Sequence, residues 1–143
     1  MIYQNTAKPN ILTCMPLGDS ITEGVGSTAT GGYRGLLLQT VRSRMGSNVI
    51  VNFIGAQSIN TSSQGMCGAS GQTVTQLNAN PYAAVQIAQY KPNVIFLHAG
   101  TNDCTQLQSG GSPTLATSQA AMTALLDTIR AAAPKCIVFL ALI

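Results

Sequence analysis

The sequence at residues 16–24 reads Pro-Leu-Gly-Asp-Ser-Ile-Thr-Glu-Gly and follows an apolar run that begins at Ile11. The run predicts a buried strand over residues 11–17, and the Gly-Asp-Ser that comes after it predicts a tight turn. A serine on such a turn, here Ser20, is presented at the carboxyl end of a strand, where α/β folds build their sites. This segment therefore predicts a fold class and a candidate nucleophile together.

Apolar strands alternate with helices along the rest of the chain. The patterns predict strands over 49–54, 94–98 and 136–143, and helices over 32–45, 81–90 and from Pro113 to Pro134. The polar residues 56–73 predict a long loop. Continuous apolar strands separated by helices are typical of a parallel sheet that is covered on both faces. The expected fold class is α/β, a three-layer α/β/α sandwich with a flavodoxin-like parallel sheet of four strands.

Composition limits the possible partners. The 143 residues are 45% hydrophobic and 8% charged, which is typical of one globular domain spanning residues 1–143. Arg34, Arg42 and Arg44 partly cluster, but the net charge is +3 and no dense basic run exists, so no nucleic-acid partner is expected. No apolar run reaches the roughly 20 residues that span a bilayer, so no membrane partner is expected either.

The polar composition and the cysteines bear on the compartment. The first ten residues are polar, so no signal peptide is visible, yet abundant Ser, Thr, Asn and Gln favour an extracellular (secreted) protein. The spacing of the cysteines matches no zinc pattern. Cys14 and Cys136 lie in apolar runs and are expected to be buried thiols. Cys67 and Cys104 lie in predicted loops, where they form either a disulfide, in an oxidising compartment, or two thiols.

Two further polar motifs follow later strands. Residues 70–73 read Ser-Gly-Gln-Thr, and residues 100–103 read Gly-Thr-Asn-Asp. Because the carboxyl ends of parallel strands meet at one edge of a sheet, we expect both motifs to lie near Ser20. The N–H of Gly71 and the amide of Asn102 can then donate to an oxyanion, each contributing about 2.7–4 kcal/mol. Glycine suits position 71 because it lets the backbone approach a ligand closely.

Each motif also has a purely structural interpretation. Gly-Asp-Ser and Gly-Thr-Asn-Asp are common in turns, and Ser-Gly-Gln-Thr is an ordinary helix start. Asp19 and Asp103 either bind turn backbone or face the pocket as substrate-binding acids. Tyr33 either lines the substrate side or, with Arg34, anchors a helix start. The order of the three motifs, each after a strand or its loop, is what favours a shared site. The chemistry expected of these residues calls for no metal or organic cofactor.

These motifs resemble those of the SGNH, or GDSL-type, hydrolases. Residues 16–24 match the first block of that family with Ser20 as nucleophile, Gly71 matches the glycine of the second block, and residues 100–103 match the third with Asn102 as the oxyanion asparagine. Further segments, Gly32-Tyr33-Arg34, Phe53-Ile54-Gly55 and Leu97-His98-Ala99-Gly100, resemble the family three carbohydrate esterases, which deacetylate xylan. The resemblance implies a serine ester hydrolase that acts on acetylated carbohydrate or a similar small acyl ester. It also implies that the N–H groups of Ser20 and Gly71 hold the oxyanion together with Asn102.

The sequence departs from the family pattern in two places. Residues 65–68 read Gly-Met-Cys-Gly where that branch has His-Glu-Gly. The family's base and its acid come from a late Asp-x-x-His, whereas the last aspartate here is Asp127 and no histidine follows it. The resemblance therefore implies that the acid–base pair, and the C-terminal part of the usual domain, lie outside these residues. The alternatives are a non-catalytic binding or assembly module, or an inactive fragment.

His98 and the last predicted strand leave two further alternatives open. His98 is the sole histidine, and it either packs beneath the site, contacts substrate, or replaces the missing base. Residues 136–143 form an apolar strand without polar alternation. As an edge strand it would expose unpaired backbone groups, so a second copy or a completing chain is expected beside it.

Overall fold

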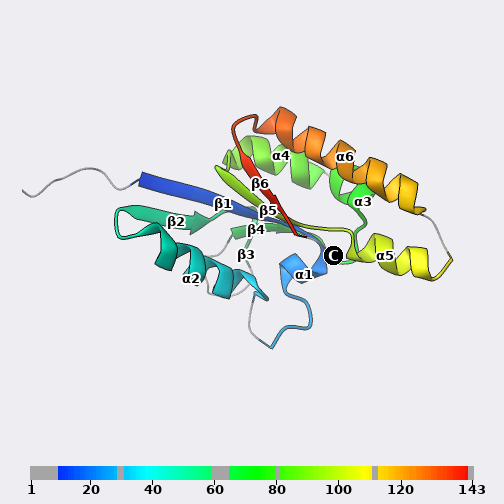
Figure 1. The fold of residues 1–143 in the computed structure, drawn as a ribbon, viewed down its shortest axis with the longest axis horizontal. Coiled ribbons are helices and arrows are strands. Elements are labelled where there is room, and N and C mark those ends of the chain that lie inside the picture. The colour runs from blue at the N-terminus through cyan, green and yellow to red at the C-terminus, as the bar shows by residue number, and fades with distance from the viewer. Residues whose placement is uncertain (1–9, 29–30, 59–64, 80, 111–112, 142–143) are drawn as a thin grey trace, which may run out of the picture.

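The computed structural model describes residues 10–28, 31–58, 65–79, 81–110 and 113–141 (Figure 1). The strands are β1 (Asn10–Gly18), β2 (Val49–Phe53), β3 (Gln57–Ser58), β4 (Gly65–Gly68), β5 (Val94–His98) and β6 (Ile137–Leu140). The helices are α1 (Ser20–Glu23), α2 (Arg34–Met45), α3 (Val74–Ala79), α4 (Pro81–Tyr90), α5 (Thr101–Gln108) and α6 (Leu115–Ala132). Helices cover both sides of the sheet, so the predicted α/β sandwich is confirmed.

Strand β1 organises the sheet. It pairs in parallel with β5 on one side, and on the other side with β2 along its first half and with β4 at its end. Strand β6 extends the sheet beyond β5, again in parallel. The carboxyl ends of β1, β4, β5 and β6 therefore reach the same edge, where α1 and α5 begin (Figure 1).

Two hydrophobic cores lie on opposite faces of the sheet. Ile95 and Leu97 of β5 pack in the core under α3, α4 and α6, whereas Val94 packs with Leu38 of α2 on the other face. Successive side chains of a strand point to opposite faces, which is why a continuous apolar run can serve both cores. The helix predicted after Pro113 buries Leu125 and Ile129 of its apolar stripe.

The prediction of four strands and one long loop was incomplete. The segment expected to be a loop over 56–73 contains β3 and β4, which pair in antiparallel fashion with each other, while β4 also pairs in parallel with β1. Strand β4 reads Gly-Met-Cys-Gly and is too short to carry a periodic pattern. It is a strand because it pairs with β1, and that pairing cannot be read from its own sequence. The short helices α1, α3 and α5 were likewise not predicted as helices. The last strand is shorter than predicted, and residues 142–143 lie outside the described residues.

Strand β6 lies at the edge of the sheet and exposes apolar side chains. Its residues Ile137 and Phe139 are 58% and 57% exposed. Among the described strands, β6 pairs with β5 alone. The ring of Phe139 stacks on that of Phe96 at a centroid distance of 5.6 Å and leaves its outer face open. Such an edge offers both backbone groups and apolar surface to another polypeptide.

The four cysteines are free thiols. Of the two alternatives for Cys67 and Cys104, the structure therefore has separate thiols, with Cys67 buried on β4 and Cys104 exposed on α5. Burial raises the pKa of Cys67 to about 12. Burial, together with the nearby Cys136, raises the pKa of Cys14 to about 11. Cys136 is partly exposed, so the prediction that it is buried was wrong, because edge strand β6 begins beside it.

Candidate active site

Ser20 is the first residue of a helix that starts directly after β1. Asp19 caps this helix, since its Oδ1 accepts a hydrogen bond from the N–H of Ile21 at 3.0 Å. The helix is one turn long and ends at Gly24, whose N–H donates to the carbonyl of Ser20 at 2.8 Å and whose φ is +91°. A strand followed at once by a capped turn holds the serine at the edge of the sheet, as the sequence predicted.

Gly18 brings the serine turn against the end of β5. In the β1–β5 register Gly18 lies opposite His98, and a Cβ on Gly18 would come within 1.9 Å of the His98 carbonyl oxygen and 2.4 Å of Thr22 Oγ1. No side chain fits at such distances. The absence of a Cβ therefore allows β1, α1 and β5 to meet at one point.

The second motif is joined to the first by the backbone. The N–H of Ala69 donates to the carbonyl of Gly18 at 3.0 Å, which extends the pairing of β4 with β1. Gly71, two residues further on, has a φ of +75°, and no described atom lies within 4 Å of the position of a Cβ. The left-handed backbone favours glycine here. Close approach of the backbone to a ligand, the predicted reason for this glycine, stays a prediction.

Side chains of the third motif form hydrogen bonds with the backbone at the second motif. Asn102 donates from Nδ2 to the carbonyl of Gln72 at 2.9 Å, and Oδ2 of Asp103 accepts from the N–H of Val74 at 2.9 Å. Both residues lie in the first turn of α5, and Val74 is the first residue of α3. Because a carboxamide nitrogen carries two hydrogens, Asn102 retains one N–H after binding Gln72. Hydrogen bonds thus connect all three motifs at the carboxyl edge of the sheet.

The two aspartates of the motifs are buried and bind backbone amides. Asp19 is 0% exposed and caps α1, and Asp103 is 3% exposed and binds the start of α3. These contacts support the alternative in which both aspartates hold turn backbone. Their assignment as substrate-binding acids stays a prediction.

Tyr33 and His98 line a hollow on the α2 side of the sheet. The hollow has a volume of about 470 Å³, and Ile21 and the rings of Phe96 and Phe139 complete much of its wall. The rings of Tyr33 and His98 are 6.2 Å apart, and Tyr33 Oη shares a hydrogen bond with Thr22 Oγ1 at 3.1 Å. Burial raises the pKa of Tyr33, so its hydroxyl stays neutral at neutral pH. The neighbouring Arg34 is buried and donates to the carbonyls of Gly31 and Glu23, as the helix-anchor interpretation expects.

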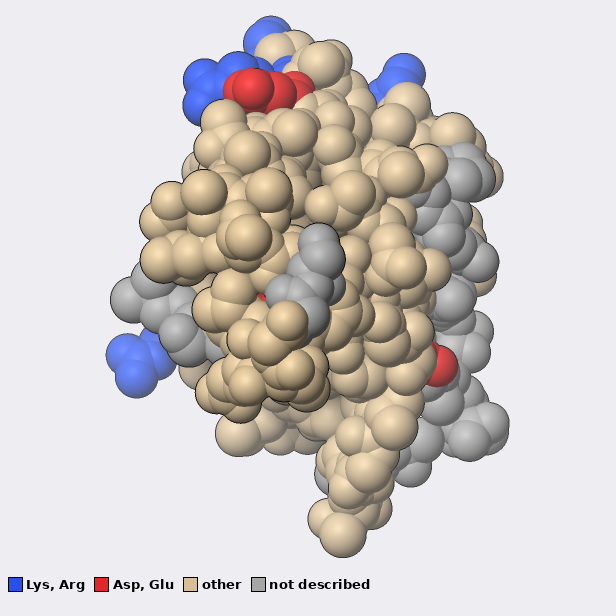
Figure 2. Space-filling view, turned by 90° about the vertical axis from the view of Figure 1, so that its right-hand side faces the viewer, with Lys and Arg blue, Asp and Glu red and all other residues tan. Residues whose placement is uncertain are grey.

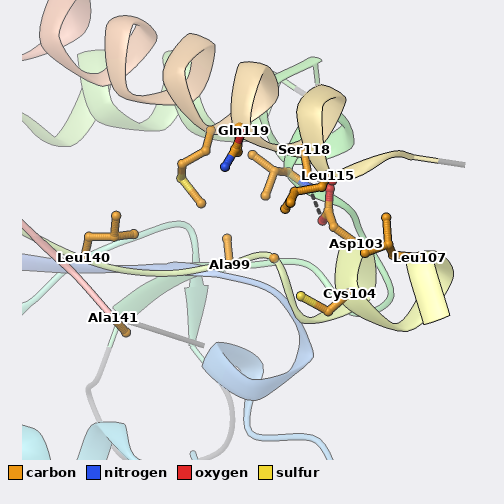
Figure 3. Close-up of a pocket in the computed structure, with 12 residues that line it drawn as sticks. Ala99, Asp103, Cys104, Leu107, Leu115, Ser118, Gln119, Leu140 and Ala141 are labelled. Atoms are coloured by element: carbon orange, nitrogen blue, oxygen red, sulfur yellow. Dashed lines mark hydrogen bonds between the residues drawn. The ribbon is translucent and has the colours of Figure 1, made fainter.

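A second hollow lies on the opposite side of the sheet, between β5, α5 and α6 (Figure 3). Its volume is about 230 Å³. Leu140 and Ala99 lie on the sheet side, Ser118 and Gln119 come from α6, and Leu107 comes from α5. The lining is mainly apolar, and the hydrogen bond between Asp103 and Val74 forms part of its wall.

His98 makes no direct contact that would activate Ser20 in this structure, and its role as a base stays a prediction. Among the described residues, no hydrogen bond joins the imidazole to the Ser20 hydroxyl. The ring lies instead beside Asp19, with Nδ1 at 3.9 Å from Oδ1. Asp127, the last aspartate of the sequence, is exposed on α6.

Sequence reasoning missed Thr22 and Val74. Thr22 is fully buried and connects α1 with Tyr33, while Val74 presents the N–H that Asp103 binds. A Ser-Gly-Gln-Thr that precedes an apolar residue is a helix-start signal, and this signal could have indicated that a helix begins at Val74. Nothing in the local sequence indicates the contact of Thr22 with Tyr33.

The described ranges hold no group of three or more His, Cys, Asp or Glu side chains arranged to bind a metal ion. Within those same ranges, no helix has the length and apolar character needed to cross a membrane.

The chain belongs to the GDSL-like Lipase/Acylhydrolase family, which it matches over residues 17–143. The resemblance inferred from the three motifs is thereby confirmed. The comparison with curated proteins gives no match.

Solved structures of esterases have the same fold. The chain is 28% identical to a family 3 carbohydrate esterase from Clostridium thermocellum, with a TM-score of 0.74 over 92% of this chain and 61% of the other. It is 25% identical to a carbohydrate esterase family 3 protein from Talaromyces cellulolyticus, with a TM-score of 0.66 over 90% and 60%. The acetyl xylan esterase AlAXEase, 21% identical, gives 0.61 over 90% and 57%, a likeness that shows the fold alone. The chain therefore spans about three fifths of the length of these proteins.

Proposed function

We propose that this chain is the nucleophile-bearing part of a serine ester hydrolase that deacetylates carbohydrate or a similar small acyl ester. Ser20 attacks the ester carbonyl, and the N–H groups of Ser20 and Gly71 and the free N–H of Asn102 stabilise the oxyanion. The observation that carries the proposal is the set of hydrogen bonds that ties the Ser20, Gly71 and Asn102 motifs to one edge of the sheet.

The developing charge explains why these groups suit the reaction. An acyl transfer places negative charge on the carbonyl oxygen, and fixed N–H donors stabilise it without having to reorganise. Ser20 is the first residue of α1 and Asn102 is held by Gln72, so both are fixed by neighbouring backbone. This rigidity is what an oxyanion hole requires.

The surface at this edge favours an uncharged substrate. Figure 2 shows the right-hand side of Figure 1, where charged side chains lie mainly toward the rim and uncharged residues cover most of the centre. Acetylated carbohydrate is neutral and needs no counter-charge for binding. Two of the solved structures with this fold are carbohydrate esterases of family 3, which supports the same substrate class.

The general base is proposed to come from a segment outside these residues that carries an Asp-x-x-His. The exposed edge of β6, with Phe139 and Leu140 beside the carboxyl edge of the sheet, is where we propose that this segment packs. This chain covers 61% of the Clostridium thermocellum structure, so that protein contains residues beyond the matched part, which supports a further segment.

An activity assay tests the proposal. Hydrolysis of a short-chain aryl acetate is measured with this chain and with the chain fused to a C-terminal Asp-x-x-His segment of a similar esterase. We expect robust turnover in the fusion, loss to background in its Ser20→Ala variant, and retention in Ser43→Ala, which alters an exposed serine on α2. Turnover that survives Ser20→Ala contradicts the proposal. Binding of an acetylated glycan by the fusion without any hydrolysis would favour the non-catalytic module.

A further inference from the structure

We propose that His98 is a positioning residue for Ser20, which carries its proton on Nδ1 and donates it to the carboxylate of Asp19. The imidazole thereby fixes the residue that caps α1 and holds the serine turn in place. The role of Ser20 rests on the proposed function, whereas the state of His98 is a property of the folded chain that can be measured without catalysis.

The first observation is a pair of buried polar groups that face each other. Asp19 is 0% exposed and the His98 side chain is 22% exposed, and Nδ1 lies 3.9 Å from Oδ1. Neither His98 Nδ1 nor Asp19 Oδ2 has a hydrogen-bond partner among the described residues. Leaving buried donors and acceptors unpaired costs free energy. A small closure of the gap between Nδ1 and Oδ1 pairs Nδ1, and it requires the hydrogen to be on Nδ1. Oδ1 then accepts from both Ile21 and His98, which its two lone pairs allow.

The second observation is that Asp19 is bound to His98 by the backbone as well. The N–H of Asp19 donates to the carbonyl of His98 at 3.4 Å. The Asp19 side chain in turn accepts from the N–H of Ile21, so the residue before Ser20 is bonded to the residue after it. Fixing Asp19 and Ile21 fixes the serine between them.

The third observation concerns the other neighbours of the imidazole. The ring of Tyr33 lies 6.2 Å from it, and the hydroxyl of Tyr33 binds Thr22 on α1. Tyr33 is neutral at neutral pH because burial raises its pKa, and the guanidinium of Arg34 is bound to the carbonyls of Gly31 and Glu23. Within the described chain, Asp19 is the carboxylate within 4 Å of the ring nitrogens. A carboxylate beside one ring nitrogen selects the tautomer protonated there, which leaves Nε2 as an acceptor.

The single histidine makes the tautomer directly measurable. A long-range ¹H–¹⁵N spectrum of the imidazole, recorded where the ring is neutral, reports on His98 alone. We expect the Nδ1-protonated form in the unmodified chain. Asp19→Ser keeps a capping oxygen but removes the carboxylate, and should shift the ring toward the Nε2-protonated form. Asp127→Asn, which alters an exposed carboxylate on α6, should change nothing. An Nε2-protonated ring in the unmodified chain, or an unchanged ring in Asp19→Ser, overturns the proposal.

A pair of substitutions separates positioning from simple packing. The side-chain amide of Asn reaches about as far as Nδ1 of histidine, and that of Gln about as far as Nε2. We expect His98→Asn to keep the exchange rate of the Ile21 amide hydrogen close to that of the unmodified chain, and His98→Gln to raise it roughly tenfold. Equal exchange rates in the two variants overturn the proposal. Neither the imidazole spectrum nor the amide exchange rate depends on catalysis. A failed esterase assay therefore contradicts the proposed function without contradicting the role of His98.

Discussion

The carboxamide of Asn102 donates to the backbone carbonyl of Gln72, one residue after Gly71, at 2.9 Å. The two residues lie 30 positions apart in the sequence, with Asn102 in the first turn of α5 and Gln72 in the segment between β4 and α3. This bond fixes the orientation of the carboxamide, so that its second N–H has a defined direction. This orientation is what the proposed role of Asn102 as an oxyanion donor requires.

Asn102→Ala is expected to lower kcat in the fused, active form by about 10²–10³-fold, because removal of one oxyanion donor has that effect elsewhere. Asn102→Asp should lower it at least as much, since a carboxylate cannot donate to Gln72 and repels the developing charge. Steady-state kinetics on an aryl acetate check both variants, with Asn52→Ala, an exposed position on β2, as the control. A change confined to KM would contradict the role of Asn102 in the transition state.

Asp103→Ala is expected to lower the free energy of unfolding by about 1–3 kcal/mol, because it leaves the N–H of Val74 unpaired at the buried start of α3. Asp103→Asn keeps an acceptor oxygen and should recover part of the loss. Urea unfolding measures both, and Asp127→Ala on the exposed side of α6 should stay within about 0.5 kcal/mol of the unmodified chain. If all three variants unfold alike, the contact between Asp103 and Val74 does not stabilise the fold.

Gly18→Ala is expected to destabilise the chain by about 3 kcal/mol or more, because the added methyl overlaps with backbone that cannot move independently of the sheet. The nearest atom, the His98 carbonyl oxygen, would lie 1.9 Å away. Gly26→Ala is the matched control, since a Cβ there meets no described atom within 4 Å, yet φ is +74°. Left-handed strain alone should cost Gly26→Ala roughly 1–2 kcal/mol. Equal losses in the two variants would show that crowding at the β1–β5 contact is not decisive.

The layers of this fold could be predicted because its longer elements carry periodic patterns. Leu125 and Ile129 are both buried in α6, as their spacing indicates, and the apolar runs of β1, β2, β5 and β6 were all identified. Strand β4 could not be predicted, because Gly-Met-Cys-Gly has no pattern of its own and pairs with Leu17 and Gly18 of a distant strand. The position of Ser20 followed from a strand and a turn adjacent in sequence.

The hydrogen bonds that join the second and third motifs could not be predicted in the same way. Asp103 and Val74 are 29 residues apart, and their contact depends on how the sheet places the starts of α5 and α3. Gly71 is a further example of what the sequence could not predict. Its motif identified the residue as part of the site, but no local pattern indicated the positive φ that favours glycine there.

The buried thiols give the chain a pH dependence on the alkaline side. Burial raises the pKa of Cys14 from 9.0 to about 11 and that of Cys67 to about 12 in the folded chain. Between about pH 9 and 11 the unfolded chain loses these protons while the folded chain keeps them, so the folded state binds more protons and its stability falls as pH rises. Below pH 9 both states are protonated and the thiols contribute no pH dependence.

Urea unfolding at pH 7.5 to 10.5, in roughly half-unit steps, should therefore show a decline above about pH 9 that is smaller in Cys67→Ala. Cys104→Ala is the control, because this thiol is exposed on α5 and its removal should leave the slope unchanged. Thiol labelling of the folded chain should follow the same order, with Cys104 reacting first and Cys67 reacting at the rate of unfolding. Fast labelling of Cys67 under folding conditions would contradict its burial, and with it the pairing of β4 against β1.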